Sequence, residues 1–529
     1  MGESSLKKVL RFKSPARVVI KFLLRSRDRK TLKCRTLKKE FEQAKREQRR
    51  LRQKYEAQEL ENRELKAQVR RAECERYHEH RDAIPALPED PSIGRHGFGP
   101  RMITLAIRLA GAVGLRAASR VLQICFEWLG LEQKVPHFTT IRCWMQRWGI
   151  ACLQKPVEAA EDMIWMADHS NQIGQEKVLS VLALRASELP PTGTTLKHAD
   201  LHVLAVEPGI SWKREDVSAV YQRLAKQYGV PRVILSDGAV ELRDSVASLK
   251  AERPDCLSLQ DFKHKAANFL ESLVGKSQRF KDFMACVGST RAEIQQTVLA
   301  HLTPPPLKAK ARFMNLRSLL EWSVMTTWLL QHPEAKSRQW APADKLESKL
   351  GWLRSFEQDL VAWDECQLVI NRGLKFINTQ GLFRGAAAQL QQVLAENLQQ
   401  SLSLQLVDRL VEFVSEAESQ IREGERLPLS TEILESSFAL YKQLERQHSK
   451  GGFTSLLAAY AGLLSTPTPD SIKTAFSKVS TKQVKQWVRE HLDTSLTAKR
   501  VSTYHEMKKA TGRGRKQNAE SVTKSTTAS

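Results

Sequence analysis

Two apolar stretches that each end in an aspartate decide the fold: residues 163–168 read MIWMAD, and residues 232–237 read RVILSD. Their apolar runs have the length of buried strands and are too short for helices. Further runs of strand length lie at 178–184, 201–206 and 256–259. Helical stretches at 215–228 and 240–250 separate the third, fourth and fifth of these runs. This order predicts an α/β domain with a mixed sheet over residues 160–264: three consecutive strands are followed by a helix, a strand, a helix and a strand.

After Lys263 the strand pattern stops, and residues 265–430 read as helices almost throughout. A stretch this long is too large for a loop, so we interpret it as an all-helical insertion, which makes the chain mostly α overall. The domain division that follows is 1–81 (basic arm and coiled coil), 82–100 (linker rich in proline and glycine), 101–152 (three helices), 160–264 (α/β core, first part), 265–430 (insertion), 431–465 (core, final helices), 466–510 (C-terminal helices) and 511–529 (polar, basic, disordered tail).

A coiled coil is predicted over residues 37–69 from seam positions that alternate spacings of four and three. Leu37, Leu51 and Leu65 fall at d positions and Asn62 at an a position, where a lone asparagine typically specifies a parallel dimer. We therefore expect a homodimer or higher oligomer. The alternative is a single solvated basic helix, because glutamines weaken the seam.

Residues 101–149 read as three short helices, at 102–110, at 115–129 and from Thr139 or Thr140 to Gly149. In the third helix one apolar face holds Ile141, Trp144, Met145 and Trp148, so Arg142, Gln146 and Arg147 are expected on the outer face. This pattern predicts a helix-turn-helix in which these three residues contact DNA. A plain three-helix core with a basic outer face fits equally well.

Charge narrows the class of partner. The formal net charge is +24, and such an imbalance favours nucleic acid or another polyanion. No apolar run reaches the length of a membrane span, and the basic N-terminus lacks a signal-peptide pattern. The eight cysteines form no CxxC pair, which argues against a zinc module. We expect a cytoplasmic, nucleoid-associated protein without a membrane partner.

Asp168 and Asp237 each follow a predicted strand. In a sheet where these two strands are neighbours, both carboxylates emerge at adjacent points and repel each other unless a cation lies between them. Carboxylates are hard oxygen ligands of the kind that Mg²⁺ prefers, and Mn²⁺ can substitute. Alone, either aspartate is more typical of a cap or turn.

A third carboxylate is expected from a helix at 431–442, whose apolar face leaves Glu435, Lys442 and Arg446 on one stripe. An acid followed by two bases suits a metal ligand beside a DNA backbone, although an ordinary surface stripe gives the same pattern.

Two further basic groups are candidates for phosphate contacts. Asp261 and His264 follow the fifth strand, where His264 could touch a phosphate; the plainer interpretation makes Asp261 a helix cap with His264 packed on it. The stretch 442–450 ends at Lys450 and can neutralise phosphates.

With these residues in place, the chain resembles the DDE transposases of bacterial insertion sequences. The matching elements, within residues 160–465, are Ala167-Asp168, Ser236-Asp237-Gly238, Asp261-Phe262-Lys263-His264, Glu435 with Lys442 and Arg446, and Gly452-Phe453. The resemblance implies an RNase H-like catalytic core in which Asp168, Asp237 and Glu435 bind two magnesium ions. Two features depart from the commonest pattern: the long separation between Asp237 and Glu435, and the coiled coil.

The function implied by this resemblance is cleavage of double-stranded DNA at element ends and transfer of the freed 3′-hydroxyl to target DNA by two metal ions. Arg142, Gln146, Arg147, His264, Lys442, Arg446 and Lys450 are the expected DNA contacts. Two other functions remain open: a non-catalytic dimeric DNA-binding regulator, and an RNase H-like nuclease without strand transfer.

Overall fold

The computed structural model describes residues 90–93, 97–173, 176–306, 313, 316–446, 453–492 and 496–510, together with helical residues within 18–31, at 57–69 and at 71. The chain divides into two compact units, residues 1–89 and 90–529. Most of the predicted coiled-coil seam, much of the linker, Lys450 and the tail lie outside the described residues. The coiled coil therefore stays a prediction, although residues 57–69 are helical.

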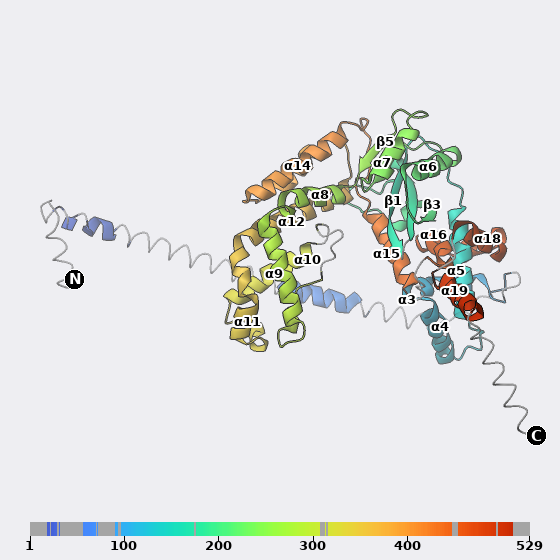
Figure 1. The fold of residues 1–529 in the computed structure, drawn as a ribbon, viewed down its shortest axis with the longest axis horizontal. Coiled ribbons are helices and arrows are strands. Elements are labelled where there is room, and N and C mark those ends of the chain that lie inside the picture. The colour runs from blue at the N-terminus through green and yellow to red at the C-terminus, as the bar shows by residue number, and fades with distance from the viewer. Residues whose placement is uncertain are drawn as a thin grey trace, which may run out of the picture. The chain divides into compact units, whose positions relative to one another are not determined.

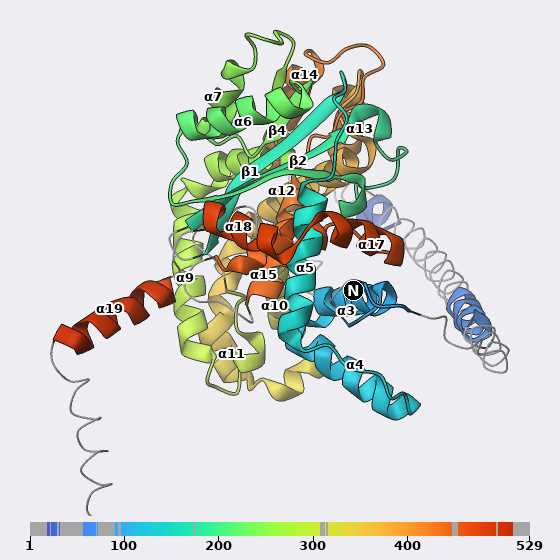
Figure 2. The same ribbon diagram turned by 90° about the vertical axis from the view of Figure 1, so that its right-hand side faces the viewer.

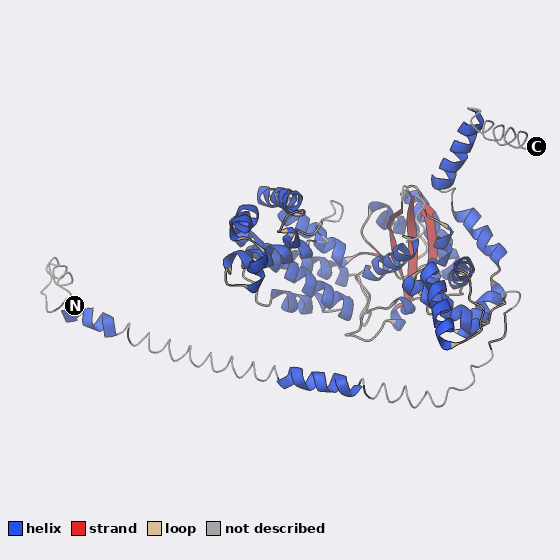
Figure 3. Cartoon of the chain, turned by 90° about the horizontal axis from the view of Figure 1, so that it is seen from below, coloured by secondary structure: helices blue, strands red, loops and turns tan. Residues whose placement is uncertain are grey.

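A five-stranded mixed sheet forms the centre of the second unit (Figures 1 and 3). Its strands are β1 (Met163–Ile173), β2 (Glu176–Arg185), β3 (His202–Gly209), β4 (Val233–Ser236) and β5 (Leu257–Gln260). The order is β3-β2-β1-β4-β5; β2 runs antiparallel to β1 and β3, and β4 runs parallel to β1 and β5. All five predicted strands are confirmed, and the topology is consistent with an RNase H-like core.

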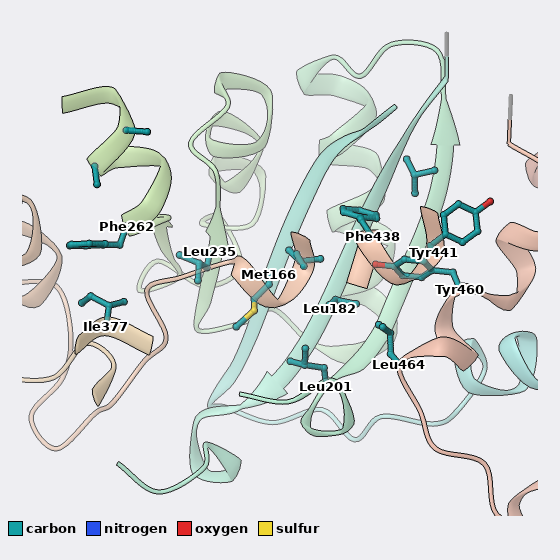
Figure 4. Packing of buried hydrophobic residues seen from close by; sticks show 14 of the residues in the cluster. Met166, Leu182, Leu201, Leu235, Phe262, Ile377, Phe438, Tyr441, Tyr460 and Leu464 are labelled. Atoms are coloured by element: carbon teal, nitrogen blue, oxygen red, sulfur yellow. The ribbon is translucent and has the colours of Figure 1, made fainter. Parts of the chain in front are cut away.

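The side chains of β1 alternate between two separate cores, as a strand buried on both faces requires. Met163, Trp165 and Ala167 pack on one side with α6 (Arg214–Tyr228) and α7 (Val240–Ser245), the two helices predicted from the sequence. Ile164 and Met166 belong to the other, larger core. Figure 4 shows Met166 there with Leu182, Leu235 and the aromatic rings of Phe438 and Tyr460.

The described residues between β5 and residue 430 are mostly helical, as predicted, apart from turns, short irregular segments and an isolated bridge between Leu382 and Leu427. The main helices are α8 (Phe262–Leu270), α9 (Gln278–Ile294), α10 (Arg317–Gln331), α11 (Ala343–Leu350), α12 (Glu357–Gln380), α13 (Ala386–Ala395) and α14 (Ser401–Glu418). Edge-to-face contacts between Trp363 and both Phe280 and Phe283 lie in their core. Their interpretation as an insertion into an RNase H-like domain stays a prediction.

The remaining helices come from both ends of the second unit. They are α3 (Pro100–Val113), α4 (Leu115–Leu129), α5 (Phe138–Leu153), α15 (Glu432–Glu445), α16 (Tyr460–Leu463), α17 (Pro469–Lys478), α18 (Thr481–His491) and α19 (Leu496–Ala510), with a 3-10 segment, η9, at Ser455–Ala459. α5 packs against α3 and α4 and also against η9, α16, α17 and α18. No described helix is long and apolar enough to cross a membrane.

The three predicted N-terminal helices are confirmed, but the prediction that Gly149 ends the third helix is wrong. α5 continues to Leu153, and Gly149 instead allows close approach to η9. A Cβ atom at Gly149 would lie 2.1 Å from the carbonyl oxygen of Ala458. On the facing segment, a Cβ at Gly462 would lie 2.6 Å from Trp148 Cδ1, so both crossing segments need glycine here.

The expected outward orientation of Gln146 and Arg147 is also wrong. Gln146 is 6% exposed and Arg147 5% exposed. Gln146 Nε2 donates to the backbone oxygen of Ser455 at 2.8 Å, and Arg147 donates to Val479 O at 2.8 Å and Phe476 O at 2.7 Å. Because C-terminal helices cover this face of α5, the two side chains satisfy backbone carbonyls inside the protein.

Candidate active site

Asp168 and Asp237 lie at neighbouring points of the sheet. Ala167 of β1 is paired with Ser236 of β4 in the parallel register. Asp168 is the next residue of β1, and Asp237 is the first residue after β4. Adjacent strands are about 4.8 Å apart, so the two backbones are close neighbours. The alternation along β1 places Asp168 on the same side as Ile164 and Met166, facing the larger core. The prediction that the strands carrying both aspartates are neighbours is confirmed.

The surroundings of Asp168 are buried and polar. Asp168 is 2% exposed and pairs with Ser180 of β2. The hydroxyl of Ser180 donates a long hydrogen bond of 3.4 Å to the hydroxyl of Tyr460. The same hydroxyl lies 2.5 Å from Ser437 Oγ on α15. Burial raises the pKa of Tyr460 to about 12, and the negative charge of Asp168 adds to this rise. Tyr460 is therefore a neutral phenol that links β2 to α15 beside Asp168.

A tight turn holds Asp237. Its Oδ1 accepts a hydrogen bond of 2.9 Å from the backbone N–H of Ala239, and Gly238 adopts a φ of +88°. A Cβ at Gly238 would lie 2.3 Å from the Nε2 of Gln260, which itself donates to the Asp237 carbonyl oxygen at 3.3 Å. The Asp-Gly pair predicted to follow this strand thus serves a specific turn: only glycine combines the positive φ with this contact.

Asp261 joins the end of β5 to the start of α15. Its side chain is 1% exposed; Oδ1 accepts from the backbone N–H of His264 at 2.7 Å and lies 2.9 Å from His264 Nδ1. Oδ2 accepts from the N–H of Thr431 at 2.5 Å and from its hydroxyl at 3.1 Å. Burial alone would raise the pKa of Asp261, but these hydrogen bonds and the charge of His264 hold it below its ordinary value. Asp261 caps α8, as the plainer interpretation predicted, and also fixes the residue before α15.

Glu435 lies one turn into α15, and a lysine contacts it. Lys263 Nζ is 2.7 Å from Glu435 Oε2 and 3.1 Å from Glu432 Oε1. Burial would lower the pKa of Lys263, but the two glutamates raise it above its ordinary value. Lys263 belongs to the Asp261-Phe262-Lys263-His264 segment but was not among the predicted site residues. Its contact with α15 could not be read from the sequence, because Lys263 and Glu435 are far apart in the chain. Glu435 is therefore an ion-pair partner in this arrangement, with its side chain 34% exposed.

His264 connects these groups electrostatically. Burial would lower its pKa, but the bond to Asp261 and the negative charges of Asp261, Asp237 and Glu435 raise it above its ordinary value. Asp237 and Glu435 thus both lie close enough to act on one imidazole. We call the ends of β4 and β5 with the first turn of α15 the acidic corner; Asp168, within β1, lies beside it on the strand that pairs with β4.

Asp168 and Asp237 match a divalent cation in donor chemistry, since Mg²⁺ is often held by one or two carboxylates while phosphate and water fill its other positions. A ready three-ligand cradle is not formed: among the described residues, no group of three or more aspartate, glutamate, histidine or cysteine side chains could hold one ion. Lys263 contacts one oxygen of Glu435, Oε2, in the position where Glu435 would have to join the two aspartates as a ligand.

A second pair lies behind the aspartates. His169 follows Asp168, and alternation directs it to the opposite side of the sheet, where its Nε2 is 2.7 Å from Glu241 Oε1 in the first turn of α7. This contact ties α7, and with it the turn that carries Asp237, to β1. Sequence reasoning missed it because the two residues lie in separate elements.

The other predicted DNA contacts differ in position. Lys442 on α15 and Arg446 at its C-cap are exposed, as predicted, and His264 is partly exposed and held by Asp261. Arg142 is half-buried on α5, and its Nε is buried without a hydrogen-bond partner. Lys450 lies outside the described residues. Lys442 and Arg446 thus lie about two and three turns beyond Glu435, at exposed positions of α15 and its C-cap.

No family model matches the chain, and no curated protein matches it. Among solved structures, the chain is similar to one titled "Drosophila P element transposase strand transfer complex", with a TM-score of 0.27 and 13% identity over 75% of this chain and 92% of that chain. The resemblance to bacterial insertion-sequence transposases stays a prediction.

Proposed function

We propose that this chain is a metal-dependent DNA transposase, which cleaves DNA at element ends and transfers the freed 3′-hydroxyl to target DNA. The observation that carries the proposal is the parallel pairing of Ala167 with Ser236, which sets Asp168 and Asp237 side by side. Two negative carboxylates on neighbouring strand positions would repel each other, and such an arrangement favours a bound cation.

Asp168 and Asp237 would hold Mg²⁺, or Mn²⁺ in its place, with Glu435 as a further ligand. When bound, the metal ions would activate the attacking oxygen and stabilise the leaving oxygen of the phosphodiester. The turn at Gly238 would hold Asp237 in place, and Asp261 would fix the start of the helix that carries Glu435. Lys442 and Arg446 would contact the DNA backbone beside these carboxylates. Oligomerisation through residues 37–69 is part of the proposal, since joining two ends to a target suits more than one copy.

Lys263 has a defined role in this proposal. It balances the charges of Glu432 and Glu435 in the arrangement described, and entry of metal and DNA would release Glu435 from it. Lys263→Met is expected to raise the affinity for Mn²⁺, measured by isothermal titration or by the electron-spin signal of free Mn²⁺. An unchanged affinity would remove Glu435 from the proposed ligand set.

The deciding experiment uses labelled duplexes made from the DNA that flanks the reading frame, with Mg²⁺ and with chelator. Wild-type protein is expected to cut and join them; Asp168→Asn and Asp237→Asn are expected to bind the duplexes but not cut them. Cutting without joining identifies a nuclease, and binding without metal-dependent cutting identifies a DNA-binding regulator. Activity retained in both variants refutes the site.

A further inference from the structure

The burial of α5 raises the question of which helix of this unit contacts DNA, and the C-terminal helices α17 and α18 offer an answer. Only Val479 and Ser480 separate them. Each helix begins with a reciprocal cap: Thr468 with Ser471, and Ser480 with Gln483. Two short, well-capped helices joined by so tight a turn have the layout of a helix-turn-helix.

The turn between them is fixed from inside by Arg147 of α5. Its guanidinium donates to Val479 O and Phe476 O and lies 4.0 Å from the centre of the Phe476 ring. Figure 2 shows α17 and α18 on either side of α5, and α5 packs against both. Arg147 is 5% exposed, so it holds the turn from within the protein.

α18 separates an apolar face from a basic one. Val484 and Trp487 are buried against the domain. Lys482, Lys485 and Arg489 are exposed, and at about 100° per residue they fall on one stripe. In the part of the chain that the structure describes, none of these three cations is in an ion pair. Three aligned, exposed cations on one side of a helix complement a polyanion.

We propose that α17, its turn and α18 form a helix-turn-helix unit in which α18 contacts duplex DNA. The stripe of Lys482, Lys485 and Arg489 would lie against the phosphates that border the groove. The choice of DNA as the occupant rests on charge complementarity and on the proposed function, which requires the protein to hold DNA. The unit predicted at residues 101–152 instead provides α5, the internal support of α17 and α18.

The test compares binding of the full-length protein to a labelled random-sequence duplex over a range of salt concentrations. The triple variant Lys482→Ala/Lys485→Ala/Arg489→Ala removes the stripe from exposed positions, where the fold does not depend on it. It is expected to bind about tenfold or more weakly at moderate salt, with the slope of log K against log salt reduced by about 3.

The matched control removes the same charge from the helical block. Lys276→Ala/Lys281→Ala/Lys345→Ala changes three exposed lysines near and within α9 and α11. It is expected to keep most of the wild-type affinity and slope. An equal loss in both triple variants, or no loss in the α18 variant, overturns the inference.

These outcomes are separable from failure of the proposed function. If the α18 variant binds like wild type while Asp168→Asn abolishes cleavage, the α18 inference fails and the transposase proposal stands. If wild type itself does not bind duplex DNA, both fail. A circular-dichroism melt of each variant verifies that altered binding does not come from unfolding.

Discussion

Replacing Asp261 with alanine tests whether one buried carboxylate sets the position of Glu435. Asp261 and Thr431 are each 1% exposed. The substitution leaves the N–H groups of Thr431 and His264 without an acceptor, and each unsatisfied buried group costs about 1–3 kcal/mol. The local unfolding free energy should therefore fall by about 1–3 kcal/mol at the start of α15, through Thr431, and by a similar amount at the start of α8, through His264.

Native-state amide hydrogen exchange over the first turn of α15 measures this loss directly, because a tenfold faster exchange corresponds to about 1.4 kcal/mol. Asp261→Asn keeps one acceptor oxygen but turns an NH₂ group toward the N–H of Thr431 or His264, so it should cost about 1–3 kcal/mol. DNA cleavage should fall in both variants, because Glu435 loses its register with the sheet.

A matched control is Asp255→Asn. Asp255 is 44% exposed and forms ion pairs with Arg253 and Arg422, and exposed pairs contribute less than about 1 kcal/mol. Exchange over α15 should not change in this control. Unchanged exchange in Asp261→Ala would refute the argument that Asp261 positions α15.

Two further predictions concern packing and pH. Gly149→Ala should lower the unfolding free energy by about 1–3 kcal/mol or more, because the added Cβ meets the backbone at Ala458. The control Gly288→Ala in α9 meets open space and should raise the unfolding free energy by about 0.5–1 kcal/mol. The denaturation midpoints of the two variants test both expectations. The raised pKa of His264 means that its charged form contributes stability below about pH 6.5, the ordinary value, and that this contribution is lost as pH rises through the folded pKa. An NMR titration should place the His264 midpoint above about 6.5 and lower it in Asp261→Ala; a wild-type midpoint at or below about 6.5 contradicts the assigned geometry.

The sheet was predictable from the sequence because its strands are buried on both faces and appear as short, continuous apolar runs. The runs ending at Asp168 and Asp237 have this form, and their adjacency was expected from the strand order of an RNase H-like sheet. β1 extends to Ile173, beyond the apolar run, because its polar end pairs with the start of β2. Apolar content cannot signal that extension.

The role of α5 was not predictable, because its partners lie far away in the chain. Gln146 bonds to Ser455, 309 positions away, and Arg147 to Val479, 332 positions away. A helix with one apolar face and a polar remainder normally exposes that remainder to solvent. Here a second layer of helices covers it, and buried carbonyls, rather than DNA, accept the hydrogen bonds.

The ion pair between Lys263 and Glu435 was hidden for a similar reason. The sequence placed Glu435 correctly on a helix with Lys442 and Arg446, but the helix that brings Lys263 to it begins 170 positions earlier, beyond the reach of any periodic pattern. The predicted cradle of Asp168, Asp237 and Glu435 therefore differs from the observed arrangement, in which a lysine contacts the third acid.

Metal-dependent cleavage by single-site variants tests the central claim most directly. With Mg²⁺ and duplexes from the flanking DNA, wild type should cut, while Asp168→Asn and Asp237→Asn should bind with unchanged affinity and show no cutting above a chelator blank. Cutting by either variant at the wild-type rate, or wild-type cutting that persists in chelator, would contradict the account.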